Sequence, residues 1–332
     1  MKRKQWIDLA RGFCMMAILL DHTEVYYTGN NIIPYHYYIT NALIGFYFIS
    51  GYLFYKNLHF NYTYKIRSIL RTIIKPYFIF TFIISISKTY CLGDGNDMFS
   101  SLKHIVYGQA SWFIAALIVG ELIFSTIVYI SKSKTWILST LSIVCFALSI
   151  VLSHQHASYP WQINNALQAI LFINLGYLYH QFEEYFNRFN TPLYIFLLLL
   201  LFIIIKVYEE YDAWNMYISP ILIDNYALFI LDKLLFSHLL ICLCKQMEKY
   251  HSNNKIQQTI NDMIAWTGAH SLVYYFLSGG IPLLVSTAMN KINYAYEGNY
   301  LRVIITFISV YIITSIFTWI IYRFFPYITG KR

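Results

Sequence analysis

The stretch ARGFCMMAILLDHTEVYY, residues 10–27, places one arginine, two acids and one histidine in an otherwise apolar run. These residues are Arg11, Asp21, His22 and Glu24. An ionisable side chain in the hydrocarbon of a bilayer costs about 3 kcal/mol or more, so it normally faces a protein interior or a water-filled cavity. The run is also about as long as a span requires. It therefore predicts a membrane helix that carries a functional site.

The composition of the whole chain is that of a membrane protein. Of its 332 residues, 58% are hydrophobic, 19% are aromatic and 12% are charged, whereas soluble domains average about 25% charged residues. No internal repeat or long linker divides the sequence. We therefore expect an all-α, polytopic integral membrane protein in which residues 1–332 form one transmembrane domain.

Apolar runs of about 20 residues predict about ten transmembrane helices. Their expected ranges are Trp6–Tyr27, Tyr35–Tyr55, Ile69–Ser87, Trp112–Ile130, Thr135–Leu152, Asn164–His180, Pro192–Val207, Asn225–Cys244, Met263–Ala288 and Leu301–Phe325.

The placement of the 24 lysines and arginines predicts the orientation. Arg11 and Lys233 lie inside predicted spans. Loops on the side away from the N-terminus hold Lys88, Lys103, Lys206, Lys291 and Arg302. All the others lie on the side of the N-terminus, which predicts that both termini are cytoplasmic. The net charge of +8 is then a topology signal, and we expect no nucleic-acid partner.

The spacing within the first span suits a long ligand. Arg11 and His22 are eleven residues apart, about three helical turns, so they lie on one stripe about 16 Å apart. Arginine binds phosphate in a bidentate manner, and an imidazole takes a proton near neutral pH. Arg11 can thus hold the anionic head of an acyl-CoA while His22 activates a hydroxyl near its thioester. The alternative is that Arg11 extends to the headgroups and His22 is a packing residue.

Several segments resemble one family. IDLARGFCMMAILLDH (residues 7–22) is similar to the opening of the membrane-bound acyltransferase type 3 family, with an arginine or lysine, ten residues and a histidine. Further segments resemble later family motifs in the expected order: FYFISGYLF (46–54), IRSILRTIIKPYFIF (66–80), SWFIAALIVGEL (111–122), LFINLGYLY (171–179) and GAHSLVYYFL (268–277). Within and after the last segment, His270 replaces a common asparagine and Ser278 replaces a second histidine of many members.

The resemblance implies transfer of an acyl group, usually acetyl, from cytoplasmic acyl-CoA to a hydroxyl of an extracytoplasmic glycan or lipid-linked sugar. It implies that His22 is catalytic and that Arg11 contacts acyl-CoA. Asp21 or Glu24 is expected to orient the imidazole. We expect acetyl-CoA as co-substrate, no metal, and a multi-pass location in the inner membrane of a bacterium. A surface polysaccharide or lipid-linked oligosaccharide would be the partner, and direct transfer and a covalent intermediate both stay open.

Cationic residues at the start of the third predicted span form a second candidate site. Arg67, Arg71 and Lys75 are four residues apart, so they are expected to form one stripe on a helix. They can bind the phosphates of CoA, or they can anchor the helix to lipid headgroups.

Other polar and aromatic residues are candidates on the substrate side. Ser50 and Tyr52 lie in the second-span motif, and Trp112 is either an interfacial residue or a platform for a sugar ring. Glu121 lies within the fourth predicted span, where we expect Arg11 or Lys233 to be its cationic partner, in a structural pair or a substrate and proton pathway.

Two further polar pairs lie in the eighth and ninth predicted spans. Asp232 and Lys233 are adjacent and point about 100° apart, so no simple mutual pair is expected. His238 and His270 can share a depth, and no role is assigned to them.

The rival function is a transporter or flippase for a lipid-linked sugar, which would use the same intramembrane charges. Transporters often contain repeated halves with matching broken helices, and none is visible in this sequence. Thioester turnover separates the two functions because a transporter releases no free CoA.

Overall fold

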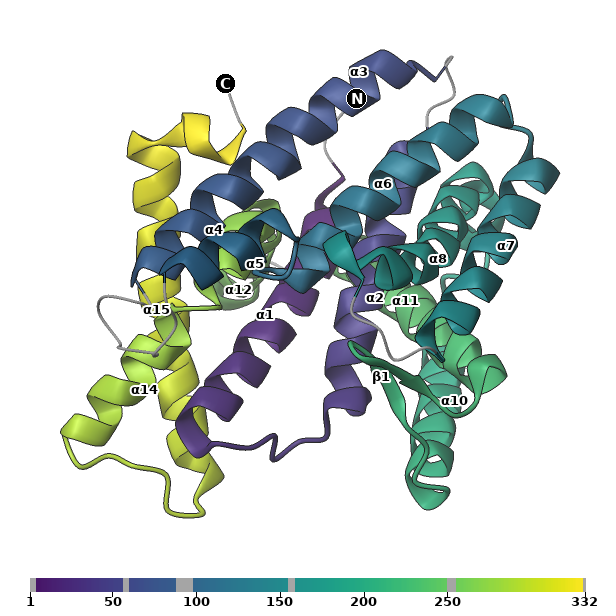
Figure 1. The fold of residues 1–332 in the computed structure, drawn as a ribbon. Helices are drawn as coiled ribbons and strands as arrows, with labels where there is room; N and C mark the ends of the chain where they lie inside the picture. The colour runs from purple at the N-terminus through teal and green to yellow at the C-terminus, as the bar shows by residue number, and fades with distance from the viewer. Residues whose placement is uncertain (1–3, 56–59, 88–97, 155–158, 250–254, 331–332) are drawn as a thin grey trace. The chain divides into compact units, whose positions relative to one another are not determined.

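The computed structural model describes residues 4–55, 60–87, 98–154, 159–249 and 255–330. Most of them are helical (Figure 1). The first half of the chain contains α1 (Gln5–Thr28), α2 (Tyr35–Phe54), α3 (Tyr62–Ile69), the π-helical η1 (Leu70–Ile74), α4 (Lys75–Ser87), α5 (Met98–Val106), α6 (Trp112–Ile130) and α7 (Thr135–Ser153). The second half contains η3 (Pro160–Gln162), α8 (Ile163–Gln181), α9 (Glu183–Asn187), α10 (Pro192–Tyr211), β1 (Met216–Ile218), β2 (Ile221–Ile223), α11 (Tyr226–Lys249), α12 (Lys255–Ala269), α13 (Ser271–Leu277), α14 (Ile281–Lys291), α15 (Tyr300–Phe324) and η4 (Pro326–Thr329).

The chain divides into two compact units. Unit 1 comprises Met1–Ile49 and Phe182–Thr318, and unit 2 comprises Ser50–Gln181 and Trp319–Arg332. Two of the three boundaries therefore fall inside α2 and α15, and the third falls between α8 and α9. Each unit is described by itself below, and the prediction of a single domain over residues 1–332 stays a prediction.

The all-α class and the multi-pass character are confirmed. Within the described residues, six helices are long and apolar enough to cross a membrane, or seven if α13 and α14 count as one bent span. The six are Tyr62–Ile86, Trp112–Ile130, Thr135–Ser153, Pro192–Tyr211, Tyr226–Lys249 and Tyr300–Phe324. α1 is long enough, but its charged residues keep it outside this set. The count of ten spans and the orientation stay predictions.

Two expected ranges were wrong. The third helical segment begins at Tyr62, seven residues before the predicted start at Ile69, because polar residues of α3 continue the same helix. The ninth expected span is broken into α12, α13 and α14, with a bend of 47° between the last two. The break falls at Gly279 and Gly280, which are poor helix formers, just before Pro282, which lacks the N–H of a helical hydrogen bond.

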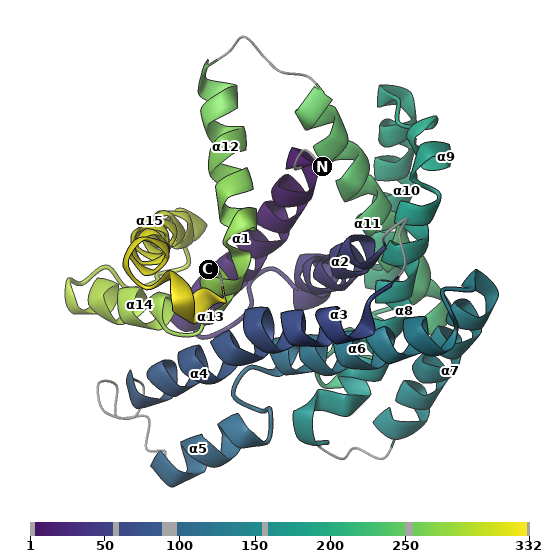
Figure 2. The ribbon, with the colours of Figure 1, turned by 90° about the horizontal axis from the view of Figure 1, so that it is seen from above.

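In unit 1, α1 is the central helix. It packs against α11, α12, α13 and α14, and Figure 2 shows it lying beside α12. The two helices cross in direct backbone contact because each has a glycine at the crossing. A Cβ atom added to Gly268 would lie 1.8 Å from the carbonyl oxygen of Asp8, and one added to Gly12 would lie 2.1 Å from that of Ile264. No other residue type fits either position without separating the helices.

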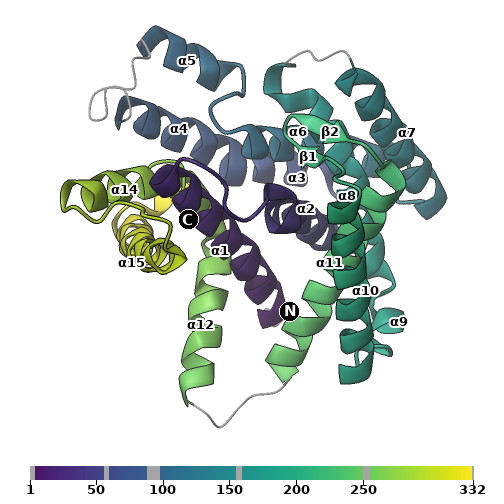
Figure 3. The same ribbon diagram turned by 90° about the horizontal axis from the view of Figure 1, so that it is seen from below.

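A short hairpin joins α10 to α11 in the same unit (Figure 3). Its strands are antiparallel, with Met216 opposite Ile223. The hydroxyl of Thr40 in α2 donates to the carbonyl oxygen of Met216 at 3.2 Å. This bond fixes the hairpin to the start of α2.

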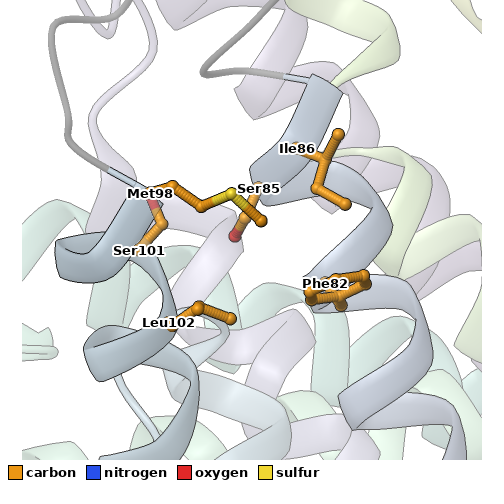
Figure 4. Close-up of a pocket in the computed structure, with 6 residues that line it drawn as sticks. All are labelled: Phe82, Ser85, Ile86, Met98, Ser101 and Leu102. Atoms are coloured by element: carbon orange, nitrogen blue, oxygen red, sulfur yellow. The ribbon is translucent and has the colours of Figure 1, made fainter.

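In unit 2, α8 packs on both α6 and α7 (Figure 1). The end of α2 reaches the backbone of α8, since a Cβ on Gly51 would lie 1.8 Å from the carbonyl oxygen of Ile173. A small cleft lies between α4 and α5 (Figure 4). It is lined by Phe82, Ser85, Ile86, Met98, Ser101 and Leu102, none of which is a predicted site residue.

We predict that Gly268→Ala destabilises the protein through this crossing. The new methyl group collides with backbone, which cannot rotate away, so the free energy of unfolding should fall by about 3 kcal/mol. Thermal unfolding in detergent measures the effect. Gly280→Ala is the matched control because its added Cβ meets no atom within 4 Å. Equal unfolding midpoints for the two variants would contradict the backbone contact.

Candidate functional site

Arg11 is held at the start of α13. Its guanidinium donates to the hydroxyl of Ser271 at 2.8 Å. Arg11 directly precedes the close crossing at Gly12, and Ser271 follows Gly268 by three residues. The backbone contact of α1 with α12 therefore sets the relative position of this pair. A planar guanidinium with several N–H donors suits an anionic group such as phosphate.

His22 is held at the end of α13. Its Nδ1 atom lies 2.8 Å from the backbone carbonyl oxygen of Ser278. A carbonyl oxygen only accepts, so Nδ1 carries the proton in this hydrogen bond. In the neutral ring, Nε2 then has the lone pair. This is the tautomer that a general base needs at Nε2.

The two residues of the stripe thus contact opposite ends of one short helix. Ser271 begins α13 and Ser278 directly follows its last residue. Sequence reasoning missed Ser271, although it lies within the motif GAHSLVYYFL, and noted Ser278 only as a departure from the family. The motif therefore lies against α1, beside both residues of the stripe.

Asp21 and Glu24 contact the loop that follows α1. Asp21 accepts a hydrogen bond from the side-chain amide of Asn31 at 2.6 Å. Glu24 is fully buried and accepts from the backbone N–H groups of Ile32 and Ile33 at 2.9 and 3.2 Å. The partner of Nδ1 of His22 is the Ser278 carbonyl rather than either carboxylate. Both acids hold the α1–α2 connection against the helix that carries His22.

His238 and His270 form hydrogen bonds with different partners. Nδ1 of His270 donates to the carbonyl oxygen of Trp266 at 2.7 Å, one turn earlier in the chain. Nε2 of His238 lies 3.0 Å from the hydroxyl of Tyr194. These contacts suit packing residues.

A buried ion network in unit 1 corrects the expectation for Asp232 and Lys233. The two residues form an ion pair despite their adjacency, because the long lysine side chain reaches back to the carboxylate. Lys206 of α10 joins both Asp232, at 2.9 Å, and Glu209, at 2.7 Å. Lys233 also donates to Asn41 of α2. The network has two cations and two carboxylates, so it is neutral.

In unit 2, Glu121 is the centre of a polar cluster. The hydroxyl of Ser50 donates to its carboxylate at 2.5 Å, and the ammonium of Lys65 lies 2.9 Å away. The expectation of Arg11 or Lys233 as its cation was wrong. The cation comes from α3, which begins earlier than predicted, and its ammonium also lies 3.6 Å from the ring centroid of Phe54.

Tyr52 is buried, whereas Trp112 is half-buried. Tyr52 is 1% exposed, and its ring stacks on His180 with centroids 3.9 Å apart. The carbonyl oxygen of Tyr52 also accepts from Nδ1 of His180 at 2.7 Å. Trp112 is half-buried and begins α6, as predicted.

Arg67 and Arg71 are exposed on α3 and η1. The expected regular stripe is interrupted because η1 is a π-helical turn, in which the N–H of Lys75 bonds to the carbonyl of Leu70. The C-terminal segment packs against this turn, since a Cβ on Gly330 would lie 2.3 Å from the carbonyl oxygen of Arg71. π-Helical turns are frequent at functional sites.

The comparison with protein families agrees with this arrangement. A family model described as an acyltransferase domain matches residues 4–329. The chain belongs to the acyltransferase 3 family. No curated protein and no solved structure matches it significantly. The resemblance carried by the first-span arginine and histidine is therefore confirmed, and the protein is a multi-pass membrane acyltransferase.

We predict that Lys65→Met destabilises the acyltransferase because it leaves the carboxylate of Glu121 buried without its cation. The lysine side chain is 25% exposed, so the loss should be about 2 kcal/mol, below that of a fully buried pair. The double variant Lys65→Met/Glu121→Gln should recover most of this loss. Thermal unfolding of the single and double variants measures the coupling, with Lys103→Met as an exposed control. Additive losses in the double variant would contradict the pair.

Proposed function

We propose that this acyltransferase moves an acyl group, acetyl in the first instance, from cytoplasmic acyl-CoA to a hydroxyl of an extracytoplasmic or lipid-linked glycan. His22 acts as the general base and Arg11 as the acyl-CoA contact. The observation that carries the proposal is the 2.8 Å bond from Nδ1 of His22 to the Ser278 carbonyl. It leaves the proton-accepting lone pair on Nε2.

The reaction at His22 is a direct transfer. Nε2 takes the proton of the acceptor hydroxyl while its oxygen attacks the thioester carbonyl carbon. The carbon–sulfur bond then breaks, and the imidazolium returns the proton to the CoA thiolate. General base catalysis of this kind contributes about 10²–10⁴-fold to the rate.

Arg11 supports binding of the donor. Its contact with Ser271 fixes the guanidinium near the start of α13. Arg11 and His22 are about three turns apart on α1. A phosphopantetheine arm spans roughly this distance, so the phosphates and the thioester can engage both residues. Arg67 and Arg71 are the proposed further phosphate contacts.

We assign Ser50, Glu121 and Trp112 to substrate contacts. Ser50 and Glu121 form a paired donor and acceptor that suits sugar hydroxyls, and Trp112 offers an aromatic face. Tyr52 supports them through its stack on His180. Asp21 and Glu24 maintain the helix end that positions His22.

We predict that His22→Ala lowers acyl transfer by about 10²–10⁴-fold because the general base is lost. Membranes containing equal amounts of each variant are incubated with radiolabelled acetyl-CoA, and O-acetyl esters on glycans and free CoA are both measured. His104→Ala is the matched control, since His104 belongs to unit 2 and bonds to Gln109.

The same assay separates the rival function. Unchanged ester formation in His22→Ala would overturn the assignment of the base. Wild-type membranes that release no free CoA with any acyl-CoA would overturn acyl transfer and favour a transporter or flippase.

We predict that Arg11→Gln raises KM for acetyl-CoA by about tenfold with a smaller effect on kcat. The reason is that a hydrogen bond to a charged group contributes about 1.5–3 kcal/mol to binding. Initial rates over a range of acetyl-CoA concentrations measure both constants. A fall in kcat alone would contradict a binding role for Arg11.

A further inference from the structure

Three side-chain amides follow one another at intervals of three residues where α8 begins. They belong to Gln162, Asn165 and Gln168, and we call them the amide ladder. Side chains three residues apart are neighbours on the surface of a helix. The first step of the ladder is a hydrogen bond, because Nδ2 of Asn165 donates to Oε1 of Gln162 at 3.0 Å.

The second step of the amide ladder, from Asn165 to Gln168, is buried. Asn165 is 4% exposed and Gln168 is 2% exposed. Oδ1 of Asn165 and Nε2 of Gln168 are both buried, and neither atom has a hydrogen-bond partner among the residues that the structure describes. Burying an amide without a compensating hydrogen bond is unfavourable. A bound polar group would satisfy both atoms.

The two atoms have complementary hydrogen-bonding roles. An amide oxygen accepts a hydrogen bond and an amide nitrogen donates one, whereas a hydroxyl group does both. One hydroxyl can therefore donate to Oδ1 of Asn165 and accept from Nε2 of Gln168. A cation would satisfy only the oxygen, and an anion would satisfy only the nitrogen. The chemistry of this step thus favours a neutral ligand that carries hydroxyl groups.

We propose that Asn165 and Gln168 bind a hydroxyl group of the acceptor sugar. The inference rests on the function proposed above and adds α8 to its substrate contacts. Both residues would hold the sugar by hydrogen bonds and take no part in proton transfer.

The amide ladder begins beside the segment that leads to Trp112, the proposed aromatic face for the sugar. The backbone N–H of Trp161, the residue before Gln162, donates to the carbonyl oxygen of Tyr107 at 2.7 Å. η3 also packs against α6, which begins at Trp112. Trp161 and Gln162 have positive φ angles of 55° and 53°. Such angles are uncommon outside glycine and cluster at ligand-binding positions.

Gln168→Met tests the second step because methionine is similar in shape and has no amide. KM for the glycan acceptor should rise by about tenfold, a factor within the range of one hydrogen bond. KM for acetyl-CoA should not change. The unfolding midpoint without glycan should not fall, because the substitution removes no hydrogen bond between described residues.

Gln181→Met is the matched control on the same helix. Gln181 forms a hydrogen bond with Thr135 at 3.3 Å, so its loss should lower the unfolding midpoint. KM for the glycan should stay at the wild-type value in this control.

The experiment uses the full-length protein in lipid nanodiscs. The probe is the glycan fraction extracted from cells of the source organism in which the gene for this acyltransferase is deleted. Ester formation is measured over a range of glycan concentrations, and the unfolding midpoint is measured over the same range. The wild-type midpoint should rise with glycan, and Gln168→Met should need about tenfold more glycan for the same rise.

The inference fails on either of two results. The first is the same midpoint response to glycan in wild type and Gln168→Met, whether large or absent. The second is a Gln168→Met midpoint that falls without glycan while KM for the glycan is unchanged, as expected of an amide with a purely structural role. Failure of the proposed function has a different signature. Wild type would then form no ester, while its midpoint would still respond to glycan more strongly than that of Gln168→Met.

Discussion

The backbone contact between α1 and α12 is the constraint on which the first-span site depends. Two glycines bring the helices so close that neither can shift along the other without a collision. A slip of one residue would move each side chain by about 1.5 Å along the helix and about 100° around it. Arg11 would then lose Ser271, and His22 would lose the Ser278 carbonyl. The register set by Gly12 and Gly268 is thus what converts two polar residues on one helix into a site.

Backbone acceptors orient several histidines of this protein, so that feature alone does not mark a catalytic residue. His180 and His270 also place Nδ1 against a carbonyl oxygen. Those two cases differ from His22 in their surroundings. The ring of His180 stacks on Tyr52, and His270 bonds within its own helical turn. His22 instead bonds to a carbonyl at a proline break in another helix, the same helix that holds Arg11.

Most helix bounds could be predicted from the sequence because they depend on local patterns. Apolar length gave the first span to within one residue at each end, and helical geometry placed Arg11 and His22 on one stripe. The partners of that pair lie more than 250 residues away in the chain, and periodicity contains no information about them. A backbone carbonyl is also invisible to a search for side-chain motifs. The break at residues 278–280 could have been predicted from Gly279, Gly280 and Pro282, had composition been weighed above length.

The buried charges of unit 1 bear on the choice between acyl transfer and transport. Adjacency appeared to exclude an Asp232–Lys233 pair, but helical angles describe Cβ directions and not the reach of a long side chain. Lys206 and Glu209 complete a network whose charges cancel. Because each buried charge of this network is paired within the protein, no charged substrate is needed to balance it. Within the described part of this unit, the first helix contributes a second polar group of contacts, those of Arg11 with Ser271 and of His22 with the Ser278 carbonyl.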